Sequence, residues 1–192
     1  MELWLATGNR GKLIEFKTLL PNLSIHTQTE LPVFSAPPET GKTFEENARI
    51  KARALKALRP DNWVAGEDSG LEVVGLNNLP GIHSARYAGP KARDQENVAK
   101  LLKMMSLRSA VNREAQFQCC IVIYSPDGTE SVIHGHLKGT ISKKVLGTDG
   151  FGYDPVFIPE GETKTLAELG TTKKNQISHR AMAIRQLQKL FL

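Results

Sequence analysis

The predicted fold is organised around one stretch, Trp63-Val64-Ala65-Gly66-Glu67-Asp68-Ser69-Gly70-Leu71. Its first half is small and apolar, which predicts a short buried strand, and the Ser-Gly after the two carboxylates predicts a turn. Because side chains alternate across a strand, Glu67 and Asp68 are expected to point in different directions. A carboxylate at the end of a strand often holds a hard cation or accepts a proton, but a solvated turn has the same local sequence.

Length and composition narrow the class of protein. The chain has 192 residues, of which 40% are hydrophobic and 23% charged, as in a globular protein with one sizeable core. No apolar run approaches the roughly 20 residues of a membrane span, and the first residues lack the pattern of a secretory signal. Cys119 and Cys120 are adjacent and poor partners for each other, so a reducing, cytoplasmic setting is expected. The net charge of +5 favours an anionic partner, which could be nucleic acid, a membrane surface or a phosphorylated small molecule.

A glycine-containing turn, Thr7-Gly8-Asn9-Arg10-Gly11-Lys12, separates an apolar run from a segment with helical spacing. A strand, a turn and a helix in this order present backbone N–H groups to an anion, and Arg10 and Lys12 add positive charge. The turn is not a Walker loop, because that motif requires Gly and Ser or Thr where this chain has Ala6 and Leu13. Phosphate binding and a plain turn both fit the stretch when it is taken alone.

Periodicity and turn residues predict the other elements. The first half of the chain is expected to contain a strand over 23–28, an irregular segment over 29–42, a helix from Thr43 to about Arg59 and a strand over 71–74. This helix opens with a capping box of Thr43 and Glu46, and its apolar stripe consists of Phe44, Ala48, Leu55 and Leu58. The second half is expected to contain a helix capped by Asp94, a strand over 115–124, its hairpin partner over 131–141, a strand over 156–158, a helical turn from Thr165 and a final helix that begins with the basic run Lys173–Arg180. Since a hairpin is antiparallel, the sheet is expected to be mixed.

Three further positions suggest a ligand. Glu39 is an acidic residue on a loop, and Lys51 lies beside the apolar stripe of its helix, where a lysine usually extends toward solvent. The loop 147–155 has glycines around Phe151 and Tyr153, which suits either a stacked planar ligand or a plug of the core. The basic run Lys173–Arg180 stands at the predicted start of the final helix, where positive charge opposes the helix dipole. Such a conflict indicates a bound anion or a site under functional demand. Together these segments suit a nucleotide with magnesium.

The motifs, taken in order, closely resemble the inosine triphosphate pyrophosphatase family. They are Thr7-Gly8-Asn9 with Gly11-Lys12, Glu39-Thr40-Gly41-x-Thr43-Phe44-x-Glu46-Asn47-Ala48, Asp68-Ser69-Gly70-Leu71, Pro80-Gly81-Ile82-x-Ser84-Ala85-Arg86-Tyr87, Gly150-Phe151-Gly152-Tyr153-Asp154-Pro155 and Ile177-Ser178-His179-Arg180. The resemblance implies one domain over 1–192 with an elongated, two-lobed α/β fold, a central mixed and twisted sheet flanked by helices, and an active-site cleft between the lobes. It also implies a homodimer that hydrolyses ITP, dITP and XTP to monophosphate and pyrophosphate, which removes deaminated purines from the nucleotide pool.

The resemblance also implies roles for individual residues. Thr7, Gly8, Asn9, Arg10, Gly11, Lys12 and Lys51 would bind the triphosphate, Glu39 and Asp68 would hold Mg²⁺, Asp68 would accept the proton of the attacking water, Ser69 would contact substrate, and Phe151, Gly152, Tyr153, Asp154, Lys174, His179 and Arg180 would form the base and sugar pocket. His179 and Arg180 are expected to donate to the oxo edge of the base. Some members of the family have Asp where this chain has Glu67. The longer side chain keeps the charge but changes its reach, so Glu67 is left out of the metal ligands.

Two other classes of function remain open at the level of sequence. A non-enzymatic nucleic-acid binder would explain the positive charge, but the basic residues are scattered and base-reading motifs are absent, so no stable nucleic-acid partner is expected. No membrane partner is expected either. The second alternative is a related pyrophosphatase that acts on pyrimidine or otherwise modified nucleotides.

Overall fold

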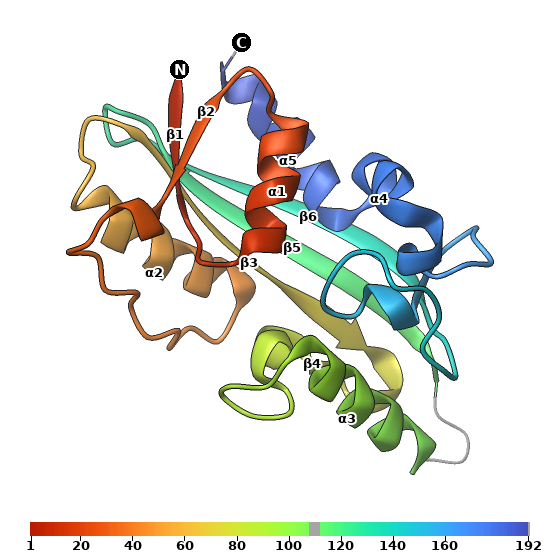
Figure 1. Cartoon of the computed structure of the whole chain (residues 1–192). Coiled ribbons are helices and arrows are strands. Elements are labelled where there is room, and N and C mark those ends of the chain that lie inside the picture. The colour runs from red at the N-terminus through yellow and green to blue at the C-terminus, as the bar shows by residue number, and fades with distance from the viewer. Residues whose placement is uncertain (108–111, 192) are drawn as a thin grey trace. The chain divides into compact units, whose positions relative to one another are not determined.

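The computed structural model describes residues 1–107 and 112–191 (Figure 1). The helices of this part of the chain are α1 (Arg10–Leu19), α2 (Phe44–Lys56), α3 (Asp94–Ser106), α4 (Leu166–Ile177) and α5 (His179–Gln188). The strands are β1 (Glu2–Ala6), β2 (Ser24–Thr27), β3 (Trp63–Val73), β4 (Leu79–Pro80), β5 (Glu114–Tyr124), β6 (Glu130–Ile141) and β7 (Phe157–Pro159). None of these helices has both the length and the apolar character that crossing a membrane requires.

The chain forms two compact units. The first comprises the described residues of Met1–Asp68, Cys119–Gly135 and Arg180–Leu192, and the second those of Ser69–Gln118 and His136–His179. Three strands, β3, β5 and β6, continue from one unit into the other. The hydrogen-bonded strand order is β2-β1-β3-β5-β6-β7, and β4 pairs with the end of β3.

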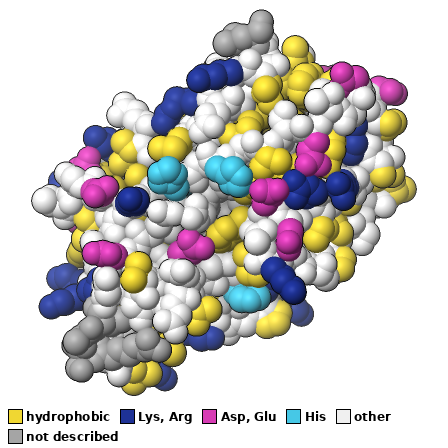
Figure 2. Space-filling model, turned by 180° about the vertical axis from the view of Figure 1, so that it is seen from behind, with side chains coloured by type: hydrophobic (Ala, Val, Ile, Leu, Met, Phe, Trp, Pro, Cys, Tyr) yellow, Lys and Arg dark blue, Asp and Glu magenta, His cyan; other side chains and the backbone are white. Residues whose placement is uncertain are grey.

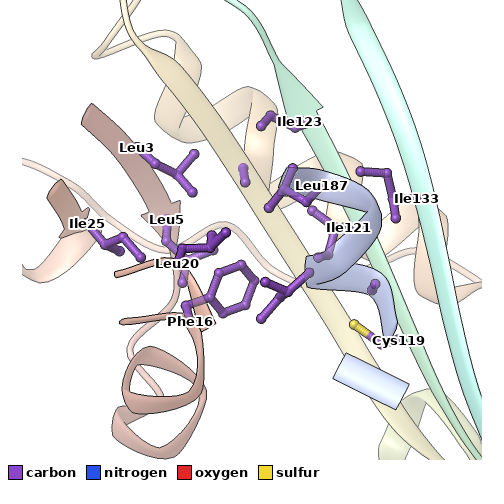
Figure 3. Packing of buried hydrophobic residues seen from close by; sticks show 13 residues of the cluster. Leu3, Leu5, Phe16, Leu20, Ile25, Cys119, Ile121, Ile123, Ile133 and Leu187 are labelled. Carbon is purple, nitrogen blue, oxygen red and sulfur yellow. The ribbon is translucent and has the colours of Figure 1, made fainter. Parts of the chain in front are cut away.

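In the first unit, β1 lies between two parallel neighbours. It pairs with β2 through Leu3 and Ile25, and with β3 through Leu5 and Ala65. Alternate residues of these strands and of β5 face α1 and α5, where they form one apolar core (Figure 3). Phe16 of α1 is fully buried in this core. The core therefore fixes α1, and with it the turn that precedes α1, against the strands.

Helix α2 covers the other face of the first unit. Ala48 and Ala52 of α2 pack against Cys120 and Val122 of β5. A Cβ atom on Gly66 of β3 would lie 2.1 Å from the backbone oxygen of Ala48. Only glycine therefore allows α2 to lie this close to β3.

The second unit has its own core and antiparallel pairs. β3 pairs antiparallel with β4, and β6 pairs antiparallel with β7. Apolar residues of α3 and α4 cover Leu71 and Val73 of β3 and Phe117 of β5. The predicted mixed α/β sheet with flanking helices is thus confirmed. The single domain and the cleft between lobes stay predictions.

The strand that carries the two carboxylates is longer than predicted. β3 runs without a break from Trp63 to Val73, so both the turn at Ser69-Gly70 and the separate strand over 71–74 are wrong. The extended backbone persists because the Leu71 N–H donates to Ser84 Oγ at 2.9 Å and because Leu71 is fully buried. Tertiary contacts override the local turn preference of Ser-Gly.

Two predicted helix boundaries also change. α2 ends at Lys56 rather than Arg59, and Leu58 of its predicted stripe is 41% exposed. Thr43 does cap α2, since its Oγ1 accepts from Glu46 N–H, but the Glu46 carboxylate accepts from Lys42 N–H instead of Thr43 N–H. The capping box is therefore only half formed.

Asp94 is not the cap of α3. Arg93 occupies the N-cap position with extended backbone, and Asp94 is the first helical residue. Its Oδ2 accepts from the N–H of Gly152 at 2.6 Å. Asp94 thus ties α3 to the glycine-rich loop that contains Phe151.

The basic run does not open the final helix. Lys173 and Lys174 lie near the end of α4, extended backbone at Ser178 ends that helix, and only His179 and Arg180 begin α5. Positive side chains at a helix C-terminus complement its dipole. The electrostatic conflict predicted for Lys173 and Lys174 is therefore wrong. Strand β7 begins one residue later than predicted, because a short helical turn over Asp154–Val156 precedes it.

The close approach of β3 and α2 gives a first testable prediction. Gly66→Ala should lower the free energy of unfolding by about 1–3 kcal/mol, because the new methyl group would overlap the backbone of α2. Urea unfolding followed by circular dichroism measures the change. Gly8→Ala is the matched control, since its Cβ would meet Gln28 at an ordinary 3.8 Å. Equal stability of the two variants would contradict the prediction.

Candidate active site

The turn before α1 is fixed by its own side chains. Asn9 is the N-cap of α1, and its Oδ1 accepts from the N–H of Lys12 at 3.0 Å. Thr7 Oγ1 accepts from the N–H of Asn9 at 3.1 Å, and Thr7 is buried. Gly8, Asn9 and Arg10 are exposed. An exposed helix N-terminus with basic neighbours is suited to an anion.

A chain of buried ion pairs lies behind this turn. Lys12 Nζ is 2.5 Å from Oε2 of Glu67, and Arg180 donates to Oε1 of Glu67 from Nε at 3.1 Å and Nη2 at 3.0 Å. The Sγ of Cys119 donates to the same Oε1 at 3.3 Å. Arg180 Nη1 also donates to Glu15 Oε2 at 2.6 Å. The side chains of Glu67 and Arg180 are at most 2% exposed.

The surroundings of Glu67 keep it ionised. Burial acts to raise the pKa of Glu67, but the attraction of Arg180 and Lys12 outweighs it and holds this pKa well below its ordinary value. Burial acts to lower the pKa of Arg180, but the attraction of Glu67 and Glu15 outweighs it and raises this pKa above its ordinary value. Burial and the nearby Glu67 raise the pKa of the Cys119 thiol, so it stays a neutral donor.

The next residue of β3, Asp68, contacts a different group of side chains. Lys51 Nζ lies 2.7 Å from Oδ1 of Asp68, 2.8 Å from Oε1 of Glu39 and 3.3 Å from the carbonyl oxygen of Glu67. Lys51 therefore joins the two carboxylates instead of extending into solvent. The predicted difference in direction between Glu67 and Asp68 is confirmed by these separate partners.

Asn47 of α2 links the loop of Glu39 to Asp68. Its Oδ1 accepts from Gly41 N–H at 2.9 Å, and its Nδ2 donates to Asp68 Oδ2 at 3.4 Å. A Cβ on Gly41 would lie 2.7 Å from that Oδ1, so glycine is needed for the loop to approach α2. Asn47 is fully buried and holds both carboxylate-bearing segments in place.

Burial also affects the protonation of Asp68. Its burial raises the pKa of this carboxyl above the ordinary value, although Lys51 and Lys12 oppose the shift. A carboxylate with a raised pKa is a better proton acceptor near neutral pH than an ordinary surface aspartate. Asp68 and Glu39 supply oxygen ligands of the kind that Mg²⁺ prefers. The described residues contain no group of three or more His, Cys, Asp or Glu side chains placed to hold a metal, whereas Mg²⁺ bound with substrate phosphates needs only one or two carboxylates.

The second unit brings together another set of predicted site residues. Lys174 Nζ lies 2.5 Å from Oδ2 of Asp154, and both side chains are buried. The same Oδ2 accepts from the N–H of Phe151 at 2.9 Å, and Lys174 Nζ lies 4.2 Å from the centroid of the Phe151 ring. Gly152 has a φ of 62°. The loop is thus folded around a buried acid–base pair with one half-buried aromatic ring.

Tyr153 and His179 belong to the core of the second unit. The Tyr153 hydroxyl donates to the carbonyl of Ser84 at 2.8 Å, and the residue is 4% exposed. The ring of His179 stacks on Phe117 with a centroid distance of 4.6 Å and an angle of 8°. Of the two loop aromatics, Tyr153 is therefore a plug of the core and Phe151 is the better candidate for stacking. Ser69 lies on β3 and is half-buried.

The first unit therefore brings together Thr7 to Lys12, Glu39, Lys51, Asp68 and Arg180, and the second brings together Phe151 to Asp154 with Lys174. Sequence reasoning missed Glu15, Asn47 and Cys119 as parts of the site. Glu15 follows Lys12 by one helical turn, and this spacing in the sequence places both side chains on the same face of the helix. Asn47 stands within a motif that carries the resemblance. Nothing in the local sequence marks Cys119.

The ion pairs of Glu67 give a second prediction. Glu67→Gln should lower the free energy of unfolding by about 3–5 kcal/mol at pH 7, because Arg180 and Lys12 lose a buried partner. Since the pKa of Glu67 is lower in the folded state, wild type loses this stabilisation as the pH falls below the ordinary range of glutamate, and the difference between the proteins should shrink there. Urea unfolding at several pH values tests this. A difference that stays constant with pH would contradict it.

Comparisons with known proteins agree with this arrangement. The sequence profile of the Ham1 family matches residues 3–190. A protein named dITP/XTP pyrophosphatase from Bdellovibrio bacteriovorus is 60% identical over 99% of this chain and 98% of its own length. The dITP/XTP pyrophosphatase of Bacillus subtilis is 40% identical over 97% of this chain and 94% of its own length.

Solved structures give the same result. The Staphylococcus aureus Ham1 protein superposes with a TM-score of 0.86 at 44% identity, covering 100% of this chain and 98% of that one. A HAM1 protein from Coxiella burnetii has the same TM-score at 39% identity, with the same two coverages. On its sequence and its fold, the chain belongs to the Ham1 family.

Proposed function

We propose that this protein is a nucleoside-triphosphate pyrophosphatase that hydrolyses dITP, XTP and ITP to the monophosphate and pyrophosphate. The proposal draws on relatives named dITP/XTP pyrophosphatase, one of them 60% identical. One observation carries it: consecutive residues of β3 present Glu67 to Lys12 of the proposed anion-binding turn and Asp68 to Lys51, which also pairs with Glu39. Such an enzyme would remove deaminated purines from the nucleotide pool.

The residues of the first unit suit hydrolysis of a phosphoanhydride. The helix N-terminus with Lys12 and Lys51 would neutralise the triphosphate, and Asp68 would accept the proton of the water that attacks the linkage between the α and β phosphates. Glu39 and Asp68 would hold Mg²⁺, which when bound supplies positive charge to the phosphate oxygens. The leaving group is pyrophosphate.

The paired side chains Asp154 and Lys174 suit selection of the base. A 6-oxo purine places a hydrogen-bond acceptor at O6 next to a donor at N1, which complements an ammonium donor next to a carboxylate acceptor. Adenine presents the reverse order, a donor at N6 and an acceptor at N1. Two mismatched buried groups at about 1–3 kcal/mol each would give a preference of roughly a hundredfold or more. Phe151 would stack on the base.

We also propose a homodimer in the cytoplasm, on the strength of the family resemblance. A duplex-binding protein is the weaker alternative. Figure 2 shows Lys and Arg side chains interspersed with Asp and Glu on one face of the molecule, whereas a nucleic-acid surface usually has a continuous basic stripe.

A substrate panel tests the proposed activity. Purified protein with Mg²⁺ should release pyrophosphate rather than orthophosphate from dITP, XTP and ITP, with kcat/KM at least about a hundredfold above that for ATP. Pyrimidine triphosphates in the same panel test the related-pyrophosphatase alternative. Salt-dependent duplex binding without any turnover would instead favour a nucleic-acid binder.

The role of Asp68 gives a separate prediction. Asp68→Asn should lower kcat by about 10²–10⁴-fold, because the amide cannot accept the proton of the water. Circular dichroism should show an intact fold. Asp127→Asn is the matched control, since Asp127 lies in the exposed turn between β5 and β6, and it should retain the wild-type kcat. A near-normal kcat for Asp68→Asn would exclude it as the proton acceptor.

A further inference from the structure

Glu15 is a charged residue inside the apolar core of the first unit. It lies on α1 between Lys12 and Phe16, and it is only 6% exposed. Burying a carboxylate costs free energy unless it is paired, and helix propensity does not compensate for this cost. The partner of Glu15 therefore has to explain its position on the buried face of α1. Its Oε2 accepts from Arg180 Nη1 at 2.6 Å.

The contacts of Arg180 show what this pairing does. The guanidinium is planar and rigid, so a bond on one of its edges fixes the direction of the others. Glu15 engages Nη1, while Nε and Nη2 donate to Glu67. Glu15 therefore sets the orientation in which Arg180 meets Glu67.

The two carboxylate oxygens of Glu67 have different partners. Oε1 takes the bonds from Arg180 and from the thiol of Cys119, and Oε2 takes Lys12 Nζ at 2.5 Å. The charges alternate along the series Glu15, Arg180, Glu67 and Lys12 and sum to zero. The series begins and ends on α1, three residues apart, and it closes through β3 and α5.

We propose that Glu15 is a positioning residue for the triphosphate. Through Arg180 and Glu67 it fixes the ammonium group of Lys12 at the anion-binding turn, and this inference rests on the proposed function. Without the charge of Glu15, Arg180 is free to turn toward Oε2 of Glu67, where it competes with Lys12. Lys12 then loses its fixed position, and binding of the phosphates weakens.

A double-mutant cycle tests the proposal. Glu15→Gln should raise the KM for dITP about tenfold with less than about a twofold change in kcat, since the Lys12 contact contributes to binding. In a Lys12→Met background, Glu15→Gln should change KM less than about twofold, because the group it positions is gone. A purely structural role of Glu15 would produce the same factor in both backgrounds.

The controls separate positioning from stability. Urea unfolding reports the stability of each variant independently of KM. Glu15→Asp keeps the charge and should recover part of the wild-type KM, and it enters the same cycle if Glu15→Gln does not fold. Glu130→Gln is the matched control, because Glu130 forms a half-buried ion pair with Arg49 in the same unit and should leave KM unchanged. Equal factors in both backgrounds, or an unchanged KM in Glu15→Gln, would overturn the proposal.

Direct binding distinguishes this test from that of the proposed function. The affinity of each cycle member for inorganic triphosphate, measured by calorimetry, should follow the same pattern as KM. If the triphosphate affinities of the cycle members follow this pattern but the wild-type protein does not hydrolyse dITP, the proposed function is refuted and the positioning role stands. Additive effects on triphosphate affinity would refute the positioning role whatever the turnover.

Discussion

The burial of Glu67 is the constraint on which the first unit depends. Removing a carboxylate from water costs several kcal/mol, and only paired charges with good hydrogen-bond geometry compensate for this. Glu67 has such partners on two helices, Lys12 of α1 and Arg180 of α5. Because both helices must lie close enough to reach it, one carboxylate on β3 links three elements that are distant in the sequence.

Alternation along β3 extends this constraint to the other face of the strand. With Glu67 directed toward α1 and α5, Asp68 is directed toward α2, where Lys51 and Asn47 contact it. Gly66 allows the close approach of α2 that brings these side chains within reach. Three consecutive residues of β3 therefore define both sides of the strand. Gly66 admits α2, Glu67 is the buried anion that faces α1 and α5, and Asp68 is the acid that pairs with Lys51 of α2.

Local signals in the sequence predicted much of the fold. The alternation of β5, the turn to β6 and the Thr43 cap were correct because each depends on neighbouring residues. The continuation of β3 through Ser69-Gly70 was not predicted, because it depends on a hydrogen bond from Leu71 to Ser84. The role of Glu15 was not visible for the same reason, since its partner Arg180 is 165 residues away. The family resemblance selected Asp68, but the partners of Glu67 lie on α1 and α5 and follow only from the folded structure.

Arg180 illustrates how a motif and a structure can suggest different roles for one residue. The resemblance places Arg180 among donors to the base, whereas its guanidinium is 2% exposed and directs donors at Glu67 and Glu15. To contact a base, Arg180 would have to give up a charge-assisted hydrogen bond to a buried carboxylate. Such a bond contributes about 1.5–3 kcal/mol to stability. Asp154 and Lys174 of the second unit are paired with each other, so a contact between them and a base would leave the ion pairs of Glu67 intact. In the structure Arg180 is therefore part of the group of ion pairs that includes Glu67 and Lys12.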